Sequence, residues 1–165
     1  MNGKNRRAGA SPPEASNDYL AEHAGLLIAS YHHWTGRNLV DTGQSALGRA
    51  RTLYEAPFFV ASHGTEPDPV FNYGIRAALA LFETTWEEFT SLPSRLSAEL
   101  VARAERERLR ARVHAHGFID DYSGVRIAIR GRRVRDRARH AMERDRRRRR
   151  AARGQAVMFR DGEYL

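Results

Sequence analysis

A loop near the middle of the chain groups residue types that can do acid–base or metal chemistry. His63, Glu66 and Asp68 place an imidazole and two carboxylates within six residues, a combination able to form a small polar or metal site at the edge of a sheet. The stretch 63–69 is also rich in Gly and Pro, and its short polar side chains suit hydrogen bonds to nearby backbone amides. Because no fourth ligand or nucleophile stands nearby, a locally bonded turn is the favoured interpretation, and no metal site is expected.

Other pairs of titratable residues are not expected to converge. Asp120 and Asp121 are neighbours in an expected strand, where consecutive side chains point to opposite faces. His32 and His33 diverge on an expected helix in the same way, and with His23 they are predicted to form its polar face. The sequence therefore predicts no catalytic residues and no enzymatic activity.

Aromatic side chains are the candidates for a ligand pocket. Between a sheet and its helices they would line a cavity, but the same residues equally describe a filled core, so both interpretations stay open. The candidates are Phe58, Phe59, Phe71, Tyr73, Phe82, Trp86, Phe118 and Tyr122.

The composition limits the classes of protein. The 165 residues include no cysteine, which excludes disulfides, thiolate zinc sites, iron–sulfur clusters, cysteine nucleophiles and flavin–thiol photochemistry. No apolar run approaches the roughly 20 residues that span a bilayer. Residues 1–13 lack the apolar segment of a signal peptide. We therefore expect a cytoplasmic protein without membrane contact.

The net charge of +8 is concentrated at one end of the chain. Residues 1–130 carry 15 basic and 15 acidic side chains, whereas residues 131–165 carry 13 basic and 5 acidic ones. A neutral globular body with one short basic segment follows from this distribution.

Periodicity and turn residues predict the elements that must position these side chains. Helices are expected over 17–35, 45–54, 75–82, 86–89 and 97–116, and strands over 58–61, 70–73, 118–129 and 154–159. Asn72, at the end of the second strand, is expected to cap the helix that follows. This order predicts an α+β domain with an antiparallel sheet. The expected divisions are a disordered leader (1–16), a helix and linker (17–44), the domain (45–159) and a tail (160–165).

Several blocks of the sequence resemble the MEKHLA domain family, which is related to PAS domains. They are residues 62–73, which hold His63, Glu66, Asp68 and Asn72, together with 92–99, 117–127 and the leading helix 17–40. The resemblance implies a PAS-like fold, with a five-stranded antiparallel sheet, short helices and one long helix. It also implies a sensory or interaction module, which is expected to bind a protein partner or to self-associate, rather than an enzyme. Whether it also takes a small ligand stays open.

Haem-binding PAS domains place a histidine on the long helix, facing the sheet. His116 is expected on the apolar stripe of the predicted long helix, together with Leu109 and Val113. A histidine at such a position is more often a core residue with one hydrogen bond, so no cofactor is expected.

Five consecutive arginines stand in the basic segment and have two interpretations. As an electrostatic arm they would bind nucleic acid, with an affinity that falls steeply as salt rises. Against this, no aromatic residue stands between them for base stacking, and they occur where the resemblance places a sheet strand. The residues are Arg146, Arg147, Arg148, Arg149 and Arg150.

The resemblance fails only over residues 134–153. The family has an apolar strand of the type Phe-x-Ile-Glu-x-Ala-Thr-Val-Trp-Asn there, followed by an Asp-Asp-Gly turn. We expect the fourth strand to be disrupted and this arginine-rich segment to project as coil or frayed helix, because a central strand of this composition would bury unpaired charge.

The genetic code offers an explanation for the missing strand. Read one base later from Val134, ordinary codons permit Phe-Val-Ile-Glu-His-Ala-Thr-Leu-Trp-Asn-Val-Thr-Asp-Ala-Asp-Gly, in which the tryptophan codon arises from those of Met142 and Glu143. Residues 134–153 are therefore hypothesised to be translated out of frame, with the frame restored near Gly154. A genuine arginine-rich arm is the alternative.

Overall fold

One antiparallel sheet of five strands organises the molecule, in the order β2-β1-β5-β4-β3. The computed structural model describes residues 11–98, 103–143 and 154–165, without the side chains of 120–123, 136–143 and 161–163. The strands are β1 (Phe59–His63), β2 (Phe71–Gly74), β3 (Phe118–Ile127), β4 (Arg133–Glu143) and β5 (Gln155–Tyr164).

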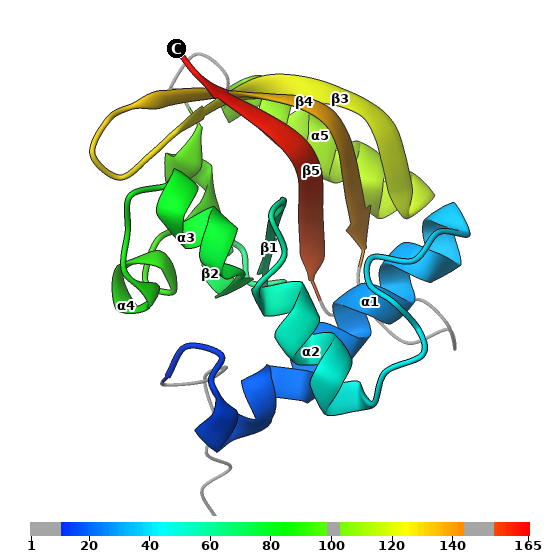
Figure 1. Cartoon of the computed structure of the whole chain (residues 1–165). Helices are drawn as coiled ribbons and strands as arrows, with labels where there is room; N and C mark the ends of the chain where they lie inside the picture. The colour runs from blue at the N-terminus through cyan, green and yellow to red at the C-terminus, as the bar shows by residue number, and fades with distance from the viewer. Residues whose placement is uncertain (1–10, 99–102, 144–153) are drawn as a thin grey trace, which may run out of the picture.

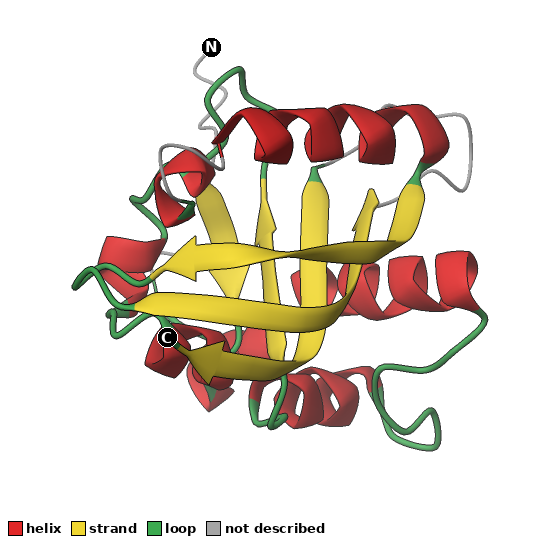
Figure 2. Cartoon of the chain, turned by 90° about the horizontal axis from the view of Figure 1, so that it is seen from above, coloured by secondary structure: helices red, strands yellow, loops and turns green. Residues whose placement is uncertain are grey.

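Helical segments cover both sides of this sheet, and the strands lie between them when the molecule is seen from above (Figure 2). The helix α5 lies behind β3 and β4, whereas α1 and α2 lie at the opposite end of β5 from the C-terminus (Figure 1). The helical segments are η1 (Ala15–Leu20), α1 (Ala21–Thr35), α2 (Ala46–Tyr54), α3 (Arg76–Leu81), α4 (Trp86–Phe89), η2 (Ser94–Ser97) and α5 (Arg103–His116). The α+β fold with an antiparallel sheet, predicted from the sequence, is confirmed.

The N-terminal helices end and begin at residues suited to those positions. Gly36 takes the left-handed conformation (φ 68°) after α1, which a residue without a Cβ adopts at little cost. At the start of α2, the Ser45 side chain accepts a hydrogen bond from the backbone N–H of Gly48. Both helices pack into the same core as the sheet, so the segment 17–44 is integral to the fold.

Stacked aromatic rings dominate the main core. The rings of Phe59 and Phe159 stack with centroids 4.3 Å apart, and those of Phe71 and Phe89 stack at 4.4 Å. Gly74 permits this packing, because a Cβ added there would lie 2.6 Å from Phe89 Cε1. These contacts join β1, β2, β5 and α4 into one apolar unit.

The expected disruption of the fourth strand is wrong for residues 133–143. β4 pairs with β3 on one side (Val125 opposite Arg135) and with β5 on the other (Arg139 opposite Phe159). The composition of this segment disfavours a central strand, but the period of its residues favours one. In the sequence arginines alternate with other residues from Arg133 to Arg139, and in the structure Arg133 and Arg135 are exposed while Val134 between them is buried. An alternation of two suits a strand with one solvated face.

The closing strand is longer than the sequence predicted. Residues 160–165 were expected as a tail, but β5 continues to Tyr164, which lies opposite Val134. The partner strand supplies the backbone hydrogen bonds that keep this end in the sheet. Residues 144–153, which hold the rest of the arginine-rich segment, lie outside the described residues, as do 1–10 of the expected leader.

The long helix buries a different set of side chains from the one expected. Its buried residues are Arg106, Leu109 and Val113, whereas His116 is exposed. Leu109 and Val113 form a small apolar cluster with Ile119 of β3, separate from the main core. His116 therefore does not face the sheet, and the arginine one helical turn before Leu109 takes a place on the buried stripe instead.

Candidate functional site

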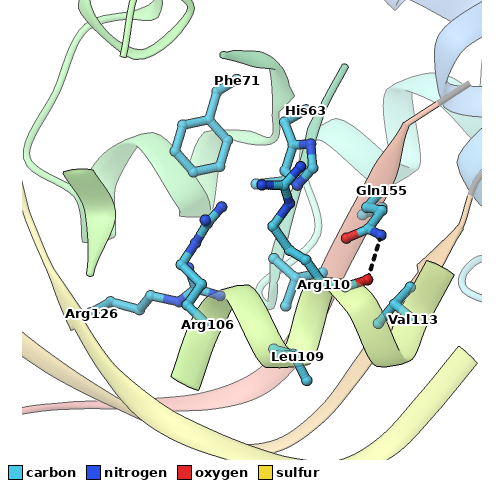
Figure 3. A pocket seen from close by; sticks show the side chains of 11 residues that line it. His63, Phe71, Arg106, Leu109, Arg110, Val113, Arg126 and Gln155 are labelled. Carbon is cyan, nitrogen blue, oxygen red and sulfur yellow. Dashed lines mark hydrogen bonds between the residues drawn. The ribbon is translucent and has the colours of Figure 1, made fainter. Parts of the chain in front are cut away.

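A hollow lies between α5 and the sheet. Residues from β1, β2, β3 and β5 line one side of it, and one face of α5 lines the other side. Segments far apart in the sequence therefore meet there (Figure 3). The lining residues are Ala61, His63, Phe71, Arg106, Leu109, Arg110, Val113, Arg126, Gln155, Ala156 and Val157.

Three arginine side chains are the charged groups that line this hollow. Arg106 and Arg110 rise from α5 toward the residues of β1 and β2, and Arg126 enters from β3 (Figure 3). Arg106 and Arg126 are only 5% and 7% exposed. Arginine is effectively always protonated in proteins. Three positively charged side chains therefore line the hollow, and one of them, Arg110, is paired with Glu107.

Hydroxyl groups of η2 hold two of these arginines. Arg106 Nη2 donates a hydrogen bond of 2.6 Å to Ser94 Oγ, and Arg126 Nη1 donates one of 3.2 Å to Ser97 Oγ. Ser97 in turn donates to the backbone carbonyl of Ser94 at 2.7 Å. Both serines are fully buried, so this arrangement fixes the two guanidinium groups relative to each other.

The third arginine and a glutamine connect α5 to its surroundings. Arg110 Nη1 pairs with Glu107 at 2.9 Å on the outer side of the helix. Its Nε is buried and has no hydrogen-bond partner in the part of the chain that the structure describes. Gln155 Nε2 donates to the backbone carbonyl of Arg110 at 3.1 Å, which ties β5 to the helix (Figure 3).

The hollow has a volume of about 40 Å³. A single water needs roughly 10–15 Å³ measured in this way, whereas drug-sized ligands occupy pockets of roughly 300–1,000 Å³. In this conformation the space therefore fits a few waters or a small molecule of similar size, and not a flavin or a haem.

The aromatic candidates belong mainly to the core. Of those with described side chains, Phe71 lines the hollow, while Phe59, Tyr73 and Trp86 are buried in the packed interior. Phe118 is half-buried against the same core, where Phe58 and Phe82 are buried too. The backbone of residue 122 belongs to β3, and its side chain lies outside the described residues. The filled core is the arrangement that this structure has.

The residues of the central loop do not share a site. His63 belongs to β1 and lines the hollow, with its Nδ1 donating to the backbone carbonyl of Gly64 at 2.8 Å. Asp68 forms an exposed ion pair with Arg95 at 3.0 Å, and Glu66 Oε1 lies 3.5 Å from the backbone N–H of Val70. Within the described residues, no group of three His, Asp or Glu side chains is placed to hold a metal ion.

A partly buried chain of polar side chains links α1 to the sheet. Ser62 Oγ donates to Asn72 Oδ1 at 2.8 Å, and His23 Nε2 lies 2.9 Å from the same Oγ. Because the hydroxyl proton is given to Asn72, His23 Nε2 is the donor in the second bond. The expected polar helix face is thus wrong for His23, which also stacks on Tyr73 with centroids 4.8 Å apart.

This arrangement of Ser62 and His23 is not a nucleophile with its base. A base must accept the hydroxyl proton, but here the proton points to Asn72 and the serine is 1% exposed. The expected cap by Asn72 is also wrong: Ile75 stands at the N-cap of α3 without a side-chain cap, and the Asn72 amide is used across the sheet instead.

The pKa of Tyr73 is strongly shifted. Burial is the main cause that raises the pKa of its phenol, with a smaller contribution from Tyr54. Its hydroxyl has no hydrogen-bond partner among the described residues. Burial therefore favours the neutral, protonated form of this phenol.

The residues that define the hollow were missed from the sequence. Arg106, Arg110, Arg126 and Gln155 come from three elements, and nothing in their local sequence distinguishes them from other arginines and glutamines. The spacing of Arg106, Leu109 and Val113 is the signal that was present, since i, i+3 and i+7 share one helix face.

The strand order and the short helices between β2 and α5 give the molecule a PAS-like fold. The structure is similar to the PAS domain of a protein from Colwellia psychrerythraea (TM-score 0.57, 7% identity, covering 72% of this chain and 94% of that one). It is also similar to a fungal light-oxygen-voltage (LOV) domain photoreceptor (TM-score 0.57, 14% identity, 92% and 96%). A third similar structure is the LOV domain of a blue-light-activated histidine kinase from Erythrobacter litoralis (TM-score 0.52, 13% identity, 67% and 98%).

The family follows from the sequence itself. Residues 21–164 match the MEKHLA domain, and the chain belongs to this family. The comparison with curated proteins finds no match. Among the described residues, no helix has both the length and the apolar composition required to cross a membrane.

Proposed function

We propose that this chain is a non-enzymatic sensory module, which takes a small ligand in the hollow between α5 and the sheet and passes the change to a protein partner or a second copy. The observation that carries the proposal is the hollow itself. It is lined by four strands and the long helix, so a ligand there would contact both layers of the domain at once.

The contacts of the lining residues support a signalling role. Arg106 and Arg126 connect α5 and β3 to η2 through Ser94 and Ser97, and Gln155 connects β5 to α5. A ligand that displaced one of these groups would shift α5 relative to the sheet. Such a shift requires only that the ligand bind one arrangement more tightly than the other.

The chemistry of the described residues argues against catalysis. His63, Glu66 and Asp68 have separate partners. In the partly buried contact between Ser62 and His23, the histidine donates a proton to the hydroxyl instead of accepting one from it. A non-enzymatic role and a cytoplasmic location stay predictions.

The test is to identify what co-purifies with the full chain. Native mass spectrometry should detect a small molecule, and the absorbance spectrum should show no visible chromophore, because about 40 Å³ holds neither flavin nor haem. Light scattering on the same sample measures self-association. A bound flavin or haem would contradict the proposed kind of ligand, and turnover of the bound molecule would contradict a non-enzymatic role.

Nucleic-acid binding through the basic segment is the second candidate. It is favoured by exposed arginines on and beside β4, namely Arg130, Arg132, Arg133 and Arg135. Arg146–Arg150 lie outside the described residues. A filter-binding series at increasing salt separates the two functions, because tight binding with a steep salt dependence would support this candidate.

A further inference from the structure

A second, larger hollow lies between α1, α2 and the linker 36–45 that joins these two helices (Figure 1). Its volume is about 520 Å³, which is within the range of roughly 300–1,000 Å³ for pockets that hold drug-sized molecules. Its described lining residues all belong to the two helices and the linker. A ligand bound there would therefore occupy a site separate from the hollow beside α5.

Small side chains form one wall of this larger hollow. Ala21, Gly25 and Ala29 follow one another at spacings of four residues and so lie on one face of α1. Gly25 is exposed, and a Cβ added there would meet nothing within 4 Å. A face of such short side chains is nearly flat, and a flat ring makes more close contacts with it than a branched chain does. The wall therefore favours an aromatic ligand.

The polar groups of the larger hollow supply positive charge and hydrogen-bond donors. Arg49 of α2 is half-buried, and its side chain has no hydrogen-bond or ion-pair partner within the part of the chain that the structure describes. Asn38 and Thr42 of the linker add an amide and a hydroxyl. Ala46, the first residue of α2, also lines the hollow, which brings the positive end of the helix dipole to it. No aspartate or glutamate is among the described lining residues, so these groups favour a ligand with negative oxygens.

A planar guanidinium such as that of Arg49 can donate two parallel N–H bonds to one carboxylate. We propose that the hollow between α1, α2 and the linker binds an aromatic carboxylate, with its ring on the face of Ala21, Gly25 and Ala29 and its carboxylate on Arg49. This site goes beyond the proposed sensory function, which rests on the hollow beside α5. Its failure would therefore leave that function untouched.

The experiment titrates the full chain by calorimetry with naphthoate, naphthamide and acetate, at constant ionic strength set by chloride. Naphthamide keeps the ring without the charge, and acetate keeps the charge without the ring. We expect naphthoate to bind about tenfold more tightly than naphthamide, because the amide forms no charge-assisted hydrogen bond with Arg49. Acetate should show no measurable binding. In a ¹⁵N spectrum, naphthoate should shift the backbone amide signals of Gly25, Ala29 and Arg49.

Variants of Gly25 test the place of binding. Gly25→Leu puts a branched side chain on the flat wall and should weaken naphthoate binding by about tenfold or more, because it occupies the space of the ring. Gly25→Ala adds one methyl group and should bind like the native chain. Both variants replace a helical glycine by a good helix former where a Cβ has room, so neither should lower the Tm. Unchanged binding by Gly25→Leu would overturn the site.

Matched variants of α2 test the role of the charge. Arg49→Gln removes a guanidinium from the hollow, whereas Arg51→Gln removes an exposed one that pairs with Glu55 and does not line it. Arg49→Gln should weaken naphthoate binding about tenfold and leave naphthamide binding unchanged. Arg51→Gln should bind both probes like the native chain. Arg49→Lys, which keeps the charge but not the planar group, should lie between the native chain and Arg49→Gln.

Three further results would overturn the assignment. Equal affinity of the native chain for naphthoate and naphthamide, or equal loss in Arg49→Gln and Arg51→Gln, would rule out a carboxylate on Arg49. Acetate binding as tight as that of naphthoate would rule out an aromatic ligand. If neither naphthalene compound bound measurably, the site itself would fail. Far-ultraviolet circular dichroism of each variant confirms that the fold is retained.

Discussion

The two ends of the sheet are packed by different chemistry. Around β1 and β2, aromatic rings of Phe59, Phe71, Phe82 and Phe89 stack or tilt against one another, with centroids 4.4–6.3 Å apart. Around β3 and α5, the separate apolar cluster contains only Leu109, Val113 and Ile119, and arginines occupy part of the buried helix face.

This contrast assigns different roles to the two ends. Burial of aromatic surface stabilises the fold strongly and leaves little freedom. Buried guanidinium groups cost desolvation energy and gain little net stability even when hydrogen-bonded. The α5 end is therefore the one whose packing a ligand can change at low cost, which is the property that a sensory module needs.

Repair of the reading frame should have the largest effect on stability, because it adds large apolar side chains to β4 beside the sparsely packed α5 end of the sheet. Replacing residues 134–149 by the shifted-frame sequence introduces Val134→Phe, Asp136→Ile, Ala141→Leu and Met142→Trp into β4. Each large apolar side chain that becomes buried contributes roughly 1.5–3 kcal/mol, so Tm should rise by about 10 °C or more. Differential scanning calorimetry of the two chains measures the shift.

Sequencing the gene across codons 133–154 provides the independent check. A single-base insertion or deletion before codon 134, compensated near codon 154, supports the out-of-frame hypothesis. An uninterrupted frame, together with an unchanged Tm of the repaired chain, would mean that the arginine-rich strand is genuine. It would also support nucleic-acid binding through the basic segment as the function.

Truncating one apolar side chain at each end of the sheet tests whether the two ends differ in how tightly they are packed. Phe89→Ala removes a fully buried ring that contacts Phe71 and Phe82, so the free energy of unfolding should fall by about 4 kcal/mol. Leu109→Ala, in the small cluster beside α5, should cost about 2 kcal/mol, the low end for such truncations, because a loosely packed site can collapse around the missing atoms. Urea unfolding monitored by circular dichroism gives both values. A Leu109→Ala loss equal to that of Phe89→Ala would show that the two ends are equally well packed.

The sequence predicted the apolar end of the molecule better than the charged end. Alternation and turn residues located β1, β2 and the short helices, because apolar side chains at strand and helix spacing have one stable arrangement. β4 was missed because charge density outweighed an alternation of Arg133, Arg135, Arg137 and Arg139 that is visible in the sequence. Backbone pairing with both neighbours does not depend on which side chains the strand carries.

The candidate site was partly out of reach of sequence analysis for another reason. His63 and Phe71 were singled out, but the arginines of the hollow are three among many, and only the packing of α5 on the sheet brings them together. Likewise, the contact of His23 with Ser62 joins residues 39 positions apart. Such contacts are set by tertiary structure rather than by local periodicity.

Two glycines with a left-handed backbone, one after α5 and one in the turn between β3 and β4, should respond differently to alanine. Gly117 (φ 82°) follows α5, and a Cβ added there would collide with the Trp34 ring of α1, whereas a Cβ at Gly131 (φ 88°) meets nothing within 4 Å. Gly131→Ala should therefore cost only the strain of the left-handed backbone, about 1 kcal/mol, and Gly117→Ala about 2 kcal/mol or more. Thermal unfolding of both variants measures the difference. Equal losses would mean that Trp34 moves aside without cost.

The smallest expected effect concerns α4, at the aromatic end. Thr85 and Glu88 form a capping box, in which the Thr85 hydroxyl accepts from the backbone N–H of Glu88 and the Glu88 carboxylate accepts from the backbone N–H of Thr85. The bond from the Thr85 backbone is the main cause that lowers the pKa of Glu88, and bonds with the Thr84 and Thr85 side chains add to it.

A lowered pKa in the folded state means that the carboxylate stabilises α4 above the ordinary glutamate value of 4.5, and that this contribution is lost as the pH falls through the folded-state pKa. Glu88→Gln should therefore reduce stability slightly at pH 7 and not at pH 3, so the difference in Tm between the variant and the native chain should shrink on acidification. Glu87→Gln, one position earlier and outside the capping box, is the control and should show no such convergence. A constant Tm difference for Glu88→Gln across this pH range would show that the cap does not depend on the charge of the carboxylate.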